Sequence, residues 1–223
     1  MKGIAFLDMD GTILSRRTVD VLCEALEKLD GLKELDKRSQ YMFEFEISQE
    51  IAHLLSGSRK EKLEELFDSI PLNENVENFI NFLKNHGFKT VIVTDSYQFL
   101  AQRLAKKLGI DLAYANTVEF KDDILTGKLL MKYPCMKIPN CKEYSLCKRR
   151  VLLELGRKFY GVTLAIGDGA SDICMVQAAD VGVAYNPKSQ QLTDVAKFVV
   201  SNFVELEKIL SQILPFKFRS SGY

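Results

Sequence analysis

The 223 residues are 47% hydrophobic and 27% charged, a composition that fits a globular chain and excludes an intrinsically disordered one. Lysine plus arginine equals aspartate plus glutamate, at 30 each, so no overall field favours nucleic acid or an anionic membrane as a partner. The apolar runs are far shorter than the roughly 20 residues that a membrane-spanning helix needs, and the N-terminus lacks a signal-type apolar segment. We therefore expect a cytoplasmic protein with a small-molecule ligand.

The first apolar run, IAFL, ends in two aspartates, Asp8 and Asp10, that are separated by one methionine. Residues two apart in an extended strand point the same way, so both carboxylates can face one pocket. Carboxylates that lie so close raise each other's pKa, and a buried strand tolerates them poorly unless a cation lies between them. The pair therefore predicts a cation-binding site at the end of the first strand.

The next segment, residues 15–71, contains helical patterns instead of a second strand. We predict that it is an inserted helical unit, which could lie over the strand ends as a lid. Residues 1–14 and 72–223 would then form the core domain. The apolar stripes of the inserted unit are Leu22, Ala25, Leu26 and Leu29, followed by Leu63, Leu66, Phe67 and Ile70.

The rest of the chain alternates short apolar runs with helical patterns. A helical stripe begins at Val76, after Asn73 as a candidate N-cap. Residues 117–130 alternate apolar and polar side chains around Gly127, which predicts a β-hairpin flap. Strands that alternate with helices imply right-handed crossovers, so we expect an α/β fold with a doubly wound parallel sheet. The predicted buried strands are IAFLD, KTVIVTD, VTLAIGD, VGVAY and KFVV.

Polar residues gather where these elements meet one edge of the predicted sheet. Ligands bind at the carboxyl ends of the strands in open α/β sheets. Each residue alone has an ordinary structural explanation, such as a strand-end hydrogen bond or a solvated cation, but their convergence predicts one site. Three carboxylates there require a hard cation, and oxygen ligands suit Mg²⁺. The candidates are Asp8 and Asp10, Thr94 and Asp95, Lys148, Asp168 and Asp172.

The cysteines are odd in number and do not form the dense framework of a small secreted domain, so we expect reduced thiols. Three of them recur six residues apart, whereas zinc sites usually show closer C-x-x-C pairs. The spacing therefore disfavours structural zinc. The five are Cys23, Cys135, Cys141, Cys147 and Cys174.

Four motifs, taken in this order, closely resemble those of the haloacid dehalogenase superfamily of phosphatases. The D-x-D-G-T motif begins at Asp8, a strand that ends in a hydroxyl residue stops at Thr94, Lys148 opens a helix, and the G-D-G-x-x-D motif ends at Asp172. The resemblance covers nearly the whole chain. An insertion between the first two motifs, as at residues 15–71, resembles the branch with helical caps that includes phosphoserine phosphatase.

The resemblance implies a Mg²⁺-dependent phosphomonoester hydrolase that acts on a small phosphorylated metabolite through an aspartyl phosphate. In that family pattern Asp8 is the nucleophile and Asp10 the general acid and base. Thr94 and Lys148 would hold phosphoryl oxygens. The metal would be held by Asp8, Asp10 and Asp168, with Asp172 positioning the metal ligands and the lysine.

The leaving group of the substrate remains open at the level of sequence. Phosphoserine phosphatases usually carry an acid shortly after the first motif and an arginine in the lid, where this chain has Arg17 and Gln49. Asp95 occupies the place where similar phosphoethanolamine and phosphocholine phosphatases hold a cationic headgroup, although an aspartate there can also cap a helix. Arg17 favours an anionic group and Asp95 a cationic one.

Three alternatives share parts of this chemistry. One is a phosphoserine phosphatase proper, and another is a phosphomutase, which passes the aspartyl phosphate to a second sugar position instead of to water. A non-catalytic phospho-receiver domain also gathers acids, a hydroxyl and a lysine around Mg²⁺. Receiver domains are shorter, have no inserted lid, and place an adjacent acid pair before the phosphorylated aspartate, so their motif order differs. The sequence does not indicate an oligomeric state.

Overall fold

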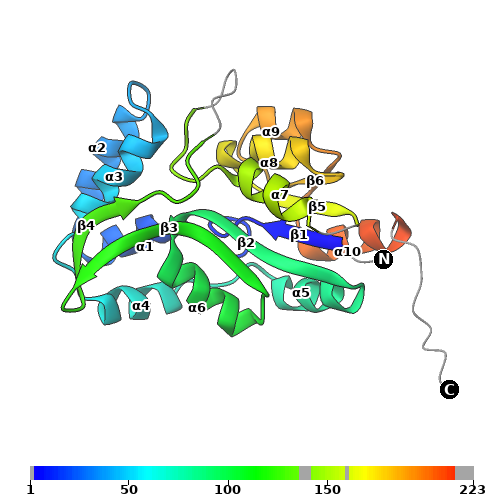
Figure 1. The fold of residues 1–223 in the computed structure, drawn as a ribbon, viewed down its shortest axis with the longest axis horizontal. Helices are drawn as coiled ribbons and strands as arrows, with labels where there is room; N and C mark the ends of the chain where they lie inside the picture. The colour runs from blue at the N-terminus through cyan, green and yellow to red at the C-terminus, as the bar shows by residue number, and fades with distance from the viewer. Residues whose placement is uncertain (1–2, 136–141, 159–160, 214–223) are drawn as a thin grey trace.

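A computed structural model describes residues 3–135, 142–158 and 161–213 of the chain (Figure 1). The strands are β1 (Gly3–Leu7), β2 (Phe88–Tyr97), β3 (Leu112–Lys121), β4 (Ile124–Leu130), β5 (Thr163–Gly167), β6 (Val181–Tyr185) and β7 (Phe198–Val200). The helices are α1 (Thr18–Ala25), α2 (Leu29–Arg38), α3 (Glu44–Leu54), α4 (Lys60–Asp68), α5 (Val76–Asn85), α6 (Gln98–Leu108), α7 (Lys148–Gly156), α8 (Ile173–Ala178), α9 (Gln190–Val195) and α10 (Phe203–Ile213), with a 3₁₀ turn η1 (Ala170–Asp172) before α8.

The strands form one seven-stranded sheet in the order β4-β3-β2-β1-β5-β6-β7. All neighbours pair in parallel except β3 and β4, which are antiparallel. From β1, the chain adds β2, β3 and β4 on one side of the sheet and then β5, β6 and β7 on the other, as in a doubly wound sheet. The predicted fold class is confirmed, and all five predicted strands are present, although β7 is only partly buried, with Val199 46% exposed. The carboxyl ends of β1, β2, β5 and β6 therefore meet at one edge.

Strands β1, β5 and β6 and most of β2 are buried on both faces, which explains why they are continuous apolar runs. Successive residues of β1 alternate between two hydrophobic clusters, with Ala5 and Leu7 in one and Ile4 and Phe6 in the other. The first cluster includes the buried faces of α5, α6 and α10, and the second those of α7, α8 and α9. Figure 1 shows α7, α8 and α9 together on one side of the sheet and α6 on the other.

The predicted hairpin at residues 117–130 is present, with its turn at Asp122 and Asp123, which both have positive φ. Its first strand is longer than predicted, because β3 begins at Leu112 and its first half pairs with β2 in the main sheet. The hairpin contacts α3: Gln49 Nε2 donates to the Gly127 carbonyl at 2.8 Å, and Gln49 Oε1 accepts from the Leu129 N–H at 3.1 Å.

The prediction of Asn73 as a helix N-cap is wrong. Helix α5 begins at Val76, and its N-cap position is Asn75 in a left-handed conformation. Asn73 instead donates its side-chain amide to the carbonyls of Gly11 and Thr12, at 3.1 and 2.8 Å. The residue therefore fixes the turn that follows β1, which carries the aspartate pair.

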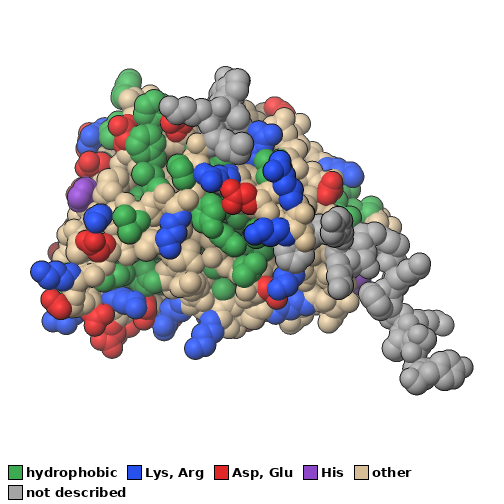
Figure 2. Space-filling view, viewed as in Figure 1, with side chains coloured by type: hydrophobic (Ala, Val, Ile, Leu, Met, Phe, Trp, Pro, Cys, Tyr) green, Lys and Arg blue, Asp and Glu red, His purple; other side chains and the backbone are tan. Residues whose placement is uncertain are grey.

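The face of the molecule in Figure 2 carries acidic and basic side chains interspersed, as the zero net charge suggests. In the part of the chain that the structure describes, no helix is both long and apolar enough to cross a membrane. Cys141, one of the three evenly spaced cysteines, lies outside the described residues, so the spacing argument against zinc remains a prediction.

Candidate active site

A buried lysine joins two of the predicted acids. Lys148 opens α7, and its Nζ lies 2.5 Å from Asp8 Oδ1 and 2.7 Å from Asp172 Oδ1. Burial opposes the charged form of Lys148, but the charges of Asp172 and Asp8 outweigh this and raise its pKa well above the usual value. The side chains of all three residues are at most 5% exposed. Lys148 is thus held as a cation between two carboxylates.

Asp172 also organises the turn that follows β5. Its Oδ2 accepts the backbone N–H groups of Asp168 and Gly169, at 3.1 and 3.0 Å, while its other oxygen accepts from Lys148. A carboxylate with this many donors is fixed in orientation. The G-D-G-x-x-D motif therefore forms a closed turn that positions Asp168 and Lys148 together.

Asp8, Asp168 and Asp172 form a buried acidic cluster whose ligand oxygens lie within 4.8 Å of one another. Burial raises the pKa of Asp8 well above its usual value, and the charges of Asp172 and Asp168 add to this, while Lys148 acts in the opposite direction. Burial similarly raises the pKa of Asp172. A hard dication would relieve this repulsion, and carboxylate oxygens are its preferred ligands, so the cluster fits a metal ion.

The cluster differs from the predicted metal set in two residues. Asp172 joins it, whereas the carboxylate of Asp10 turns away toward α1, where Asp10 Oδ1 accepts from both the N–H and the hydroxyl of Thr18. Burial raises the pKa of Asp10 to about 7, although these hydrogen bonds act against the shift. Asp10 is therefore a carboxyl group that can exchange a proton near neutral pH.

Lys188 is a site residue that the sequence reasoning missed. Its Nζ lies 2.7 Å from Asp168 Oδ2, and its backbone N–H donates to the Asp168 carbonyl at 2.8 Å. The side chain of Lys188 is 67% exposed. It follows β6 in the stretch VGVAYNPK, so the strand-end rule that located the other candidates could have found it as well.

Thr94 is fully buried near the end of β2, and its hydroxyl oxygen accepts the backbone N–H of Ser96 at 3.2 Å. Strand β2 runs on to Tyr97 and helix α6 begins at Gln98 with Tyr97 as its N-cap residue, so Asp95 does not cap this helix. Asp95 and Ser96 therefore belong to the last part of β2, and both line the pocket described next.

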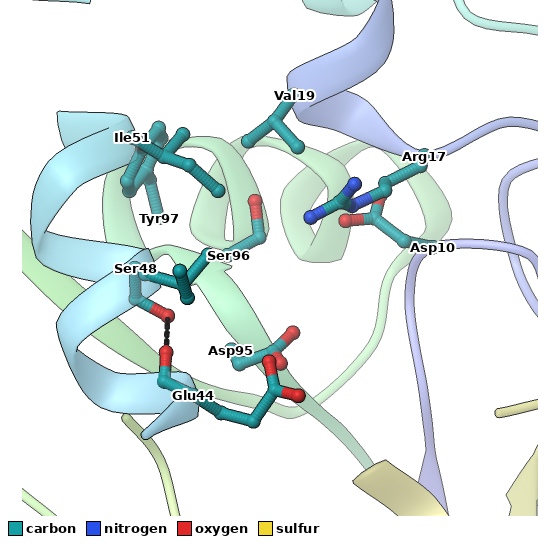
Figure 3. Close-up of a pocket in the computed structure, with 10 residues that line it drawn as sticks. Asp10, Arg17, Val19, Glu44, Ser48, Ile51, Asp95, Ser96 and Tyr97 are labelled. Carbon is teal, nitrogen blue, oxygen red and sulfur yellow. Dashed lines mark hydrogen bonds between the residues drawn. The ribbon is translucent and has the colours of Figure 1, made fainter. Parts of the chain in front are cut away.

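A pocket of about 70 Å³ lies between α3, the end of β2 and the segment that follows β1 (Figure 3). It brings together three residues from the sequence analysis, Asp10, Arg17 and Asp95. It does not bring Gln49 with them, since the Gln49 side chain is bound to the β4 strand. The lining residues are Asp10, Arg17, Val19, Glu44, Ile47, Ser48, Ile51, Asp95, Ser96 and Tyr97.

The turn after β1 requires glycine at residue 11. Gly11 has φ +89°, and a Cβ there would lie 2.2 Å from Asp168 Oδ2 and 2.8 Å from Lys188 Nζ. We expect Gly11→Ala to lower the free energy of unfolding by about 2–4 kcal/mol, from backbone strain and displacement of Asp168. Chemical denaturation measures this.

Gly57 supplies the matched control for that variant, because it has φ +84° but a Cβ there meets nothing within 4 Å. Gly57→Ala should cost only the backbone strain, about 1 kcal/mol. Equal losses in the two variants would show that the contact with Asp168 is unimportant.

The shifted pKa of Asp10 predicts a pH-dependent stability of the metal-free protein. The folded-state pKa of about 7 exceeds the ordinary 3.8, so the unfolded chain releases this proton first, and stability falls as pH rises between these values. Asp10→Asn removes the partly buried charge and keeps an acceptor for Thr18. We expect the variant to be more stable than the parent by about 1–2 kcal/mol near pH 8, with the gap closing toward about pH 4. Thermal unfolding in chelator tests this, and a gap independent of pH would contradict it.

Comparison with known proteins places the chain in a family. A family model described as haloacid dehalogenase-like hydrolase matches residues 5–177, and a second model of the same description matches residues 158–205. The phosphoserine phosphatase of Archaeoglobus fulgidus is 31% identical over 98% of this chain, which spans 62% of that protein's length. The phosphoserine phosphatase of Idiomarina loihiensis is 30% identical, with 94% of each chain covered.

Solved structures show the same fold. One described as a phospho-aspartyl intermediate analogue of phosphoserine phosphatase has a TM-score of 0.78 at 24% identity, covering 93% of this chain and 98% of that one. A substrate-bound phosphoserine phosphatase complex has a TM-score of 0.78 at 24% identity, covering 95% and 98%. The chain therefore belongs to the haloacid dehalogenase-like hydrolases, and it is a phosphatase similar to phosphoserine phosphatases.

Proposed function

We propose that this chain hydrolyses phosphate monoesters of small metabolites by passing the phosphoryl group first to Asp8 and then to water. The observation that carries the proposal is the buried contact of Lys148 Nζ with Asp8 Oδ1, at 2.5 Å, beside Asp168 and Asp172. It supports a nucleophilic carboxylate with a fixed cation at its side. Phosphate monoesters react extremely slowly in water because two anions must approach each other, so charge neutralisation is the main requirement.

The acidic cluster supports Mg²⁺ as the cofactor. Asp8 and Asp168 would hold the ion, with Asp172 fixing the turn behind them. Asp10, the third predicted ligand, has its carboxylate on Thr18 outside this cluster and would serve as the proton carrier. When bound, the ion supplies positive charge that neutralises the phosphoryl oxygens.

The residues of the chain then divide the reaction between them. A carboxylate oxygen of Asp8 forms a bond to phosphorus as the bond from phosphorus to the leaving oxygen breaks. Asp10 gives its proton to that oxygen and later accepts one from the water that cleaves the aspartyl phosphate, a role that a pKa of about 7 suits. Lys148 and the Thr94 hydroxyl would stabilise the transferred group.

We also propose that residues 15–71, which include α1 to α4, act as a cap over this centre. The pocket beside Asp10 is lined by residues of this segment on one side and by residues of β2 on the other. Its small volume suits a leaving group of a few heavy atoms. Phosphoserine, named for the relatives, is a candidate of this size, and the substrate is treated further below.

Release of inorganic phosphate from an aryl phosphate tests the proposed function. We expect steady release with Mg²⁺ and loss of release with chelator. A phosphomutase would release phosphate only when a bisphosphate primer is present, and that result would replace the hydrolase proposal. Absence of any phosphate transfer would contradict both.

A further inference from the structure

We propose that the pocket beside Asp10 binds a positively charged leaving group, so that the preferred substrates are phosphate esters of small amino alcohols that carry no carboxylate. This inference rests on the proposed phosphatase function and names the substrate class of the same site. Four features of the pocket support it.

The first feature is an acidic pair. Asp95 extends from β2 and Glu44 lies at the start of α3, and Figure 3 shows their carboxylates beside each other. Within the described residues, neither carboxylate has a basic partner within 4.0 Å. Burial raises the pKa of Glu44; the charge of the exposed Lys142 lowers it, that of Asp95 raises it, and that of Arg17 lowers it. The pair thus presents negative charge to whatever occupies the pocket.

The second feature is that the positive charge of Arg17, the arginine of the pocket, is already balanced by two acids. Arg17 Nη1 lies 3.1 Å from Asp36 Oδ1 and 3.4 Å from Asp20 Oδ1. The charges of Asp36 and Asp20, with a smaller effect of Asp95, raise the pKa of Arg17 against the effect of burial. A substrate carboxylate would have to compete with both acids for this guanidinium, and it would face Asp95 and Glu44 while doing so.

The third feature is that the side chain of Gln49 is hydrogen-bonded to the backbone of β4. Its amide donates to the Gly127 carbonyl and its oxygen accepts from the Leu129 N–H, so both polar ends of the side chain are used in joining α3 to β4. The side chain is therefore not directed to a ligand. Neither of the two positions at which the sequence suggested a polar group for the substrate offers an unpaired cation.

The fourth feature is an unpartnered hydroxyl inside the pocket. Ser96 is 5% exposed, and its Oγ has no hydrogen-bond partner among the described residues. Figure 3 shows this hydroxyl pointing into the space that the lining residues enclose. A buried polar atom without a partner is costly, and an N–H of an ammonium group would satisfy Ser96 Oγ as an acceptor. Two carboxylates and one hydroxyl oxygen form an acceptor set that suits an ammonium ion.

The test compares three esters of similar size that differ in charge: phosphoethanolamine, propyl phosphate and phosphoglycolate, with phosphoserine as a fourth. We expect kcat/KM for phosphoethanolamine to exceed that for propyl phosphate by about 10–100-fold, the range of hydrogen bonds to charged groups. Phosphoglycolate should be the poorest substrate, and phosphoserine should fall below phosphoethanolamine.

Variants of the two pocket acids test which residues cause the preference for phosphoethanolamine. Asp95→Asn and Glu44→Gln should each reduce the ratio of kcat/KM between phosphoethanolamine and propyl phosphate toward one. Glu50→Gln, on the same helix as Glu44 but outside the pocket, is the control and should leave the ratio unchanged. A ratio that stays high in both pocket variants would contradict the assignment of these acids.

The outcomes separate this inference from the function on which it rests. Hydrolysis of all esters without preference for the amine, or with preference for phosphoserine, would overturn the inference and leave the phosphatase intact. No hydrolysis of any ester would overturn the proposed function instead. Calorimetric binding of phosphoethanolamine and propyl phosphate to Asp8→Asn then tests the pocket alone, and equal affinities would overturn the inference.

Discussion

Asp8→Asn should abolish phosphate release, with kcat falling by at least ~10⁴-fold, because an amide cannot form the acyl phosphate on which the two-step reaction depends. The substitution keeps the shape of the side chain. Its amide oxygen can still accept from Lys148 Nζ, which lies 2.5 Å from Asp8 Oδ1. It also removes one of three mutually repelling carboxylates from the cluster. We therefore expect a folded protein whose thermal stability without metal is at least that of the parent.

The measurement is initial-rate phosphate release, with unfolding recorded on the same preparations. Asp194→Asn, an exposed acid on α9, is the control and should retain full activity. Activity in Asp8→Asn above about 1% of the parent would mean that another group attacks phosphorus.

Lys148→Met should have the largest effect on stability. The side chains of Lys148, Asp8 and Asp172 are 2%, 5% and 1% exposed, so the substitution leaves two buried carboxylates without their cation. Breaking a buried pair in this way costs about 3–5 kcal/mol. Because burial already raises the pKa values of Asp8 and Asp172, the carboxylates will protonate on acidification. The loss should therefore be greatest near pH 8 and smaller toward about pH 5.

A second substitution keeps this prediction testable where the single variant folds poorly. Lys148→Met with Asp172→Asn removes one charge together with its partner, and the asparagine oxygen can still accept from the N–H groups of Asp168 and Gly169. We expect the double variant to regain part of the stability and none of the activity, since transition-state charge stabilisation is still missing. Denaturant unfolding and phosphate release measure the two effects. A double variant less stable than the single one would contradict the role of Lys148 as counterion.

Local sequence patterns were sufficient to predict the positions of five of the seven strands, and the buried part of the site. Apolar runs that end in Asp8, Asp168 and Thr94 are buried on both faces, so their strands could be recognised without knowledge of their neighbours. Parallel pairing then requires their carboxyl ends to meet. The meeting of Asp8 and Asp168 follows from that geometry, and Lys148 joins them from the start of α7.

The substrate pocket depended on how helices pack, which the local pattern does not encode. Arg17 is paired with Asp36, 19 residues away on α2. Because this pairing balances the charge of Arg17, the residue is not available to bind an anionic group of the substrate. Glu44 enters the pocket because α3 lies over the end of β2. Ser96 is buried there because β2 continues to Tyr97, beyond its last predicted residue. These contacts are set by tertiary packing.

Sequence periodicity also did not predict the orientation of the Asp10 side chain. Alternation along a strand would point Asp8 and Asp10 to the same side, but the chain leaves β1 at Leu7 and turns at Gly11. The Asp10 carboxylate consequently meets the first turn of α1 at Thr18.

Covalent labelling of Asp8 tests the central claim most directly. The enzyme is mixed with a phosphorus-labelled monoester and Mg²⁺, quenched in acid within the first turnover, digested and mapped by mass spectrometry. We predict a phosphoryl group on the peptide that contains Asp8, appearing before free phosphate and absent from Asp8→Asn. Free phosphate released at full rate with no labelled peptide, or a label on another residue, would contradict the account.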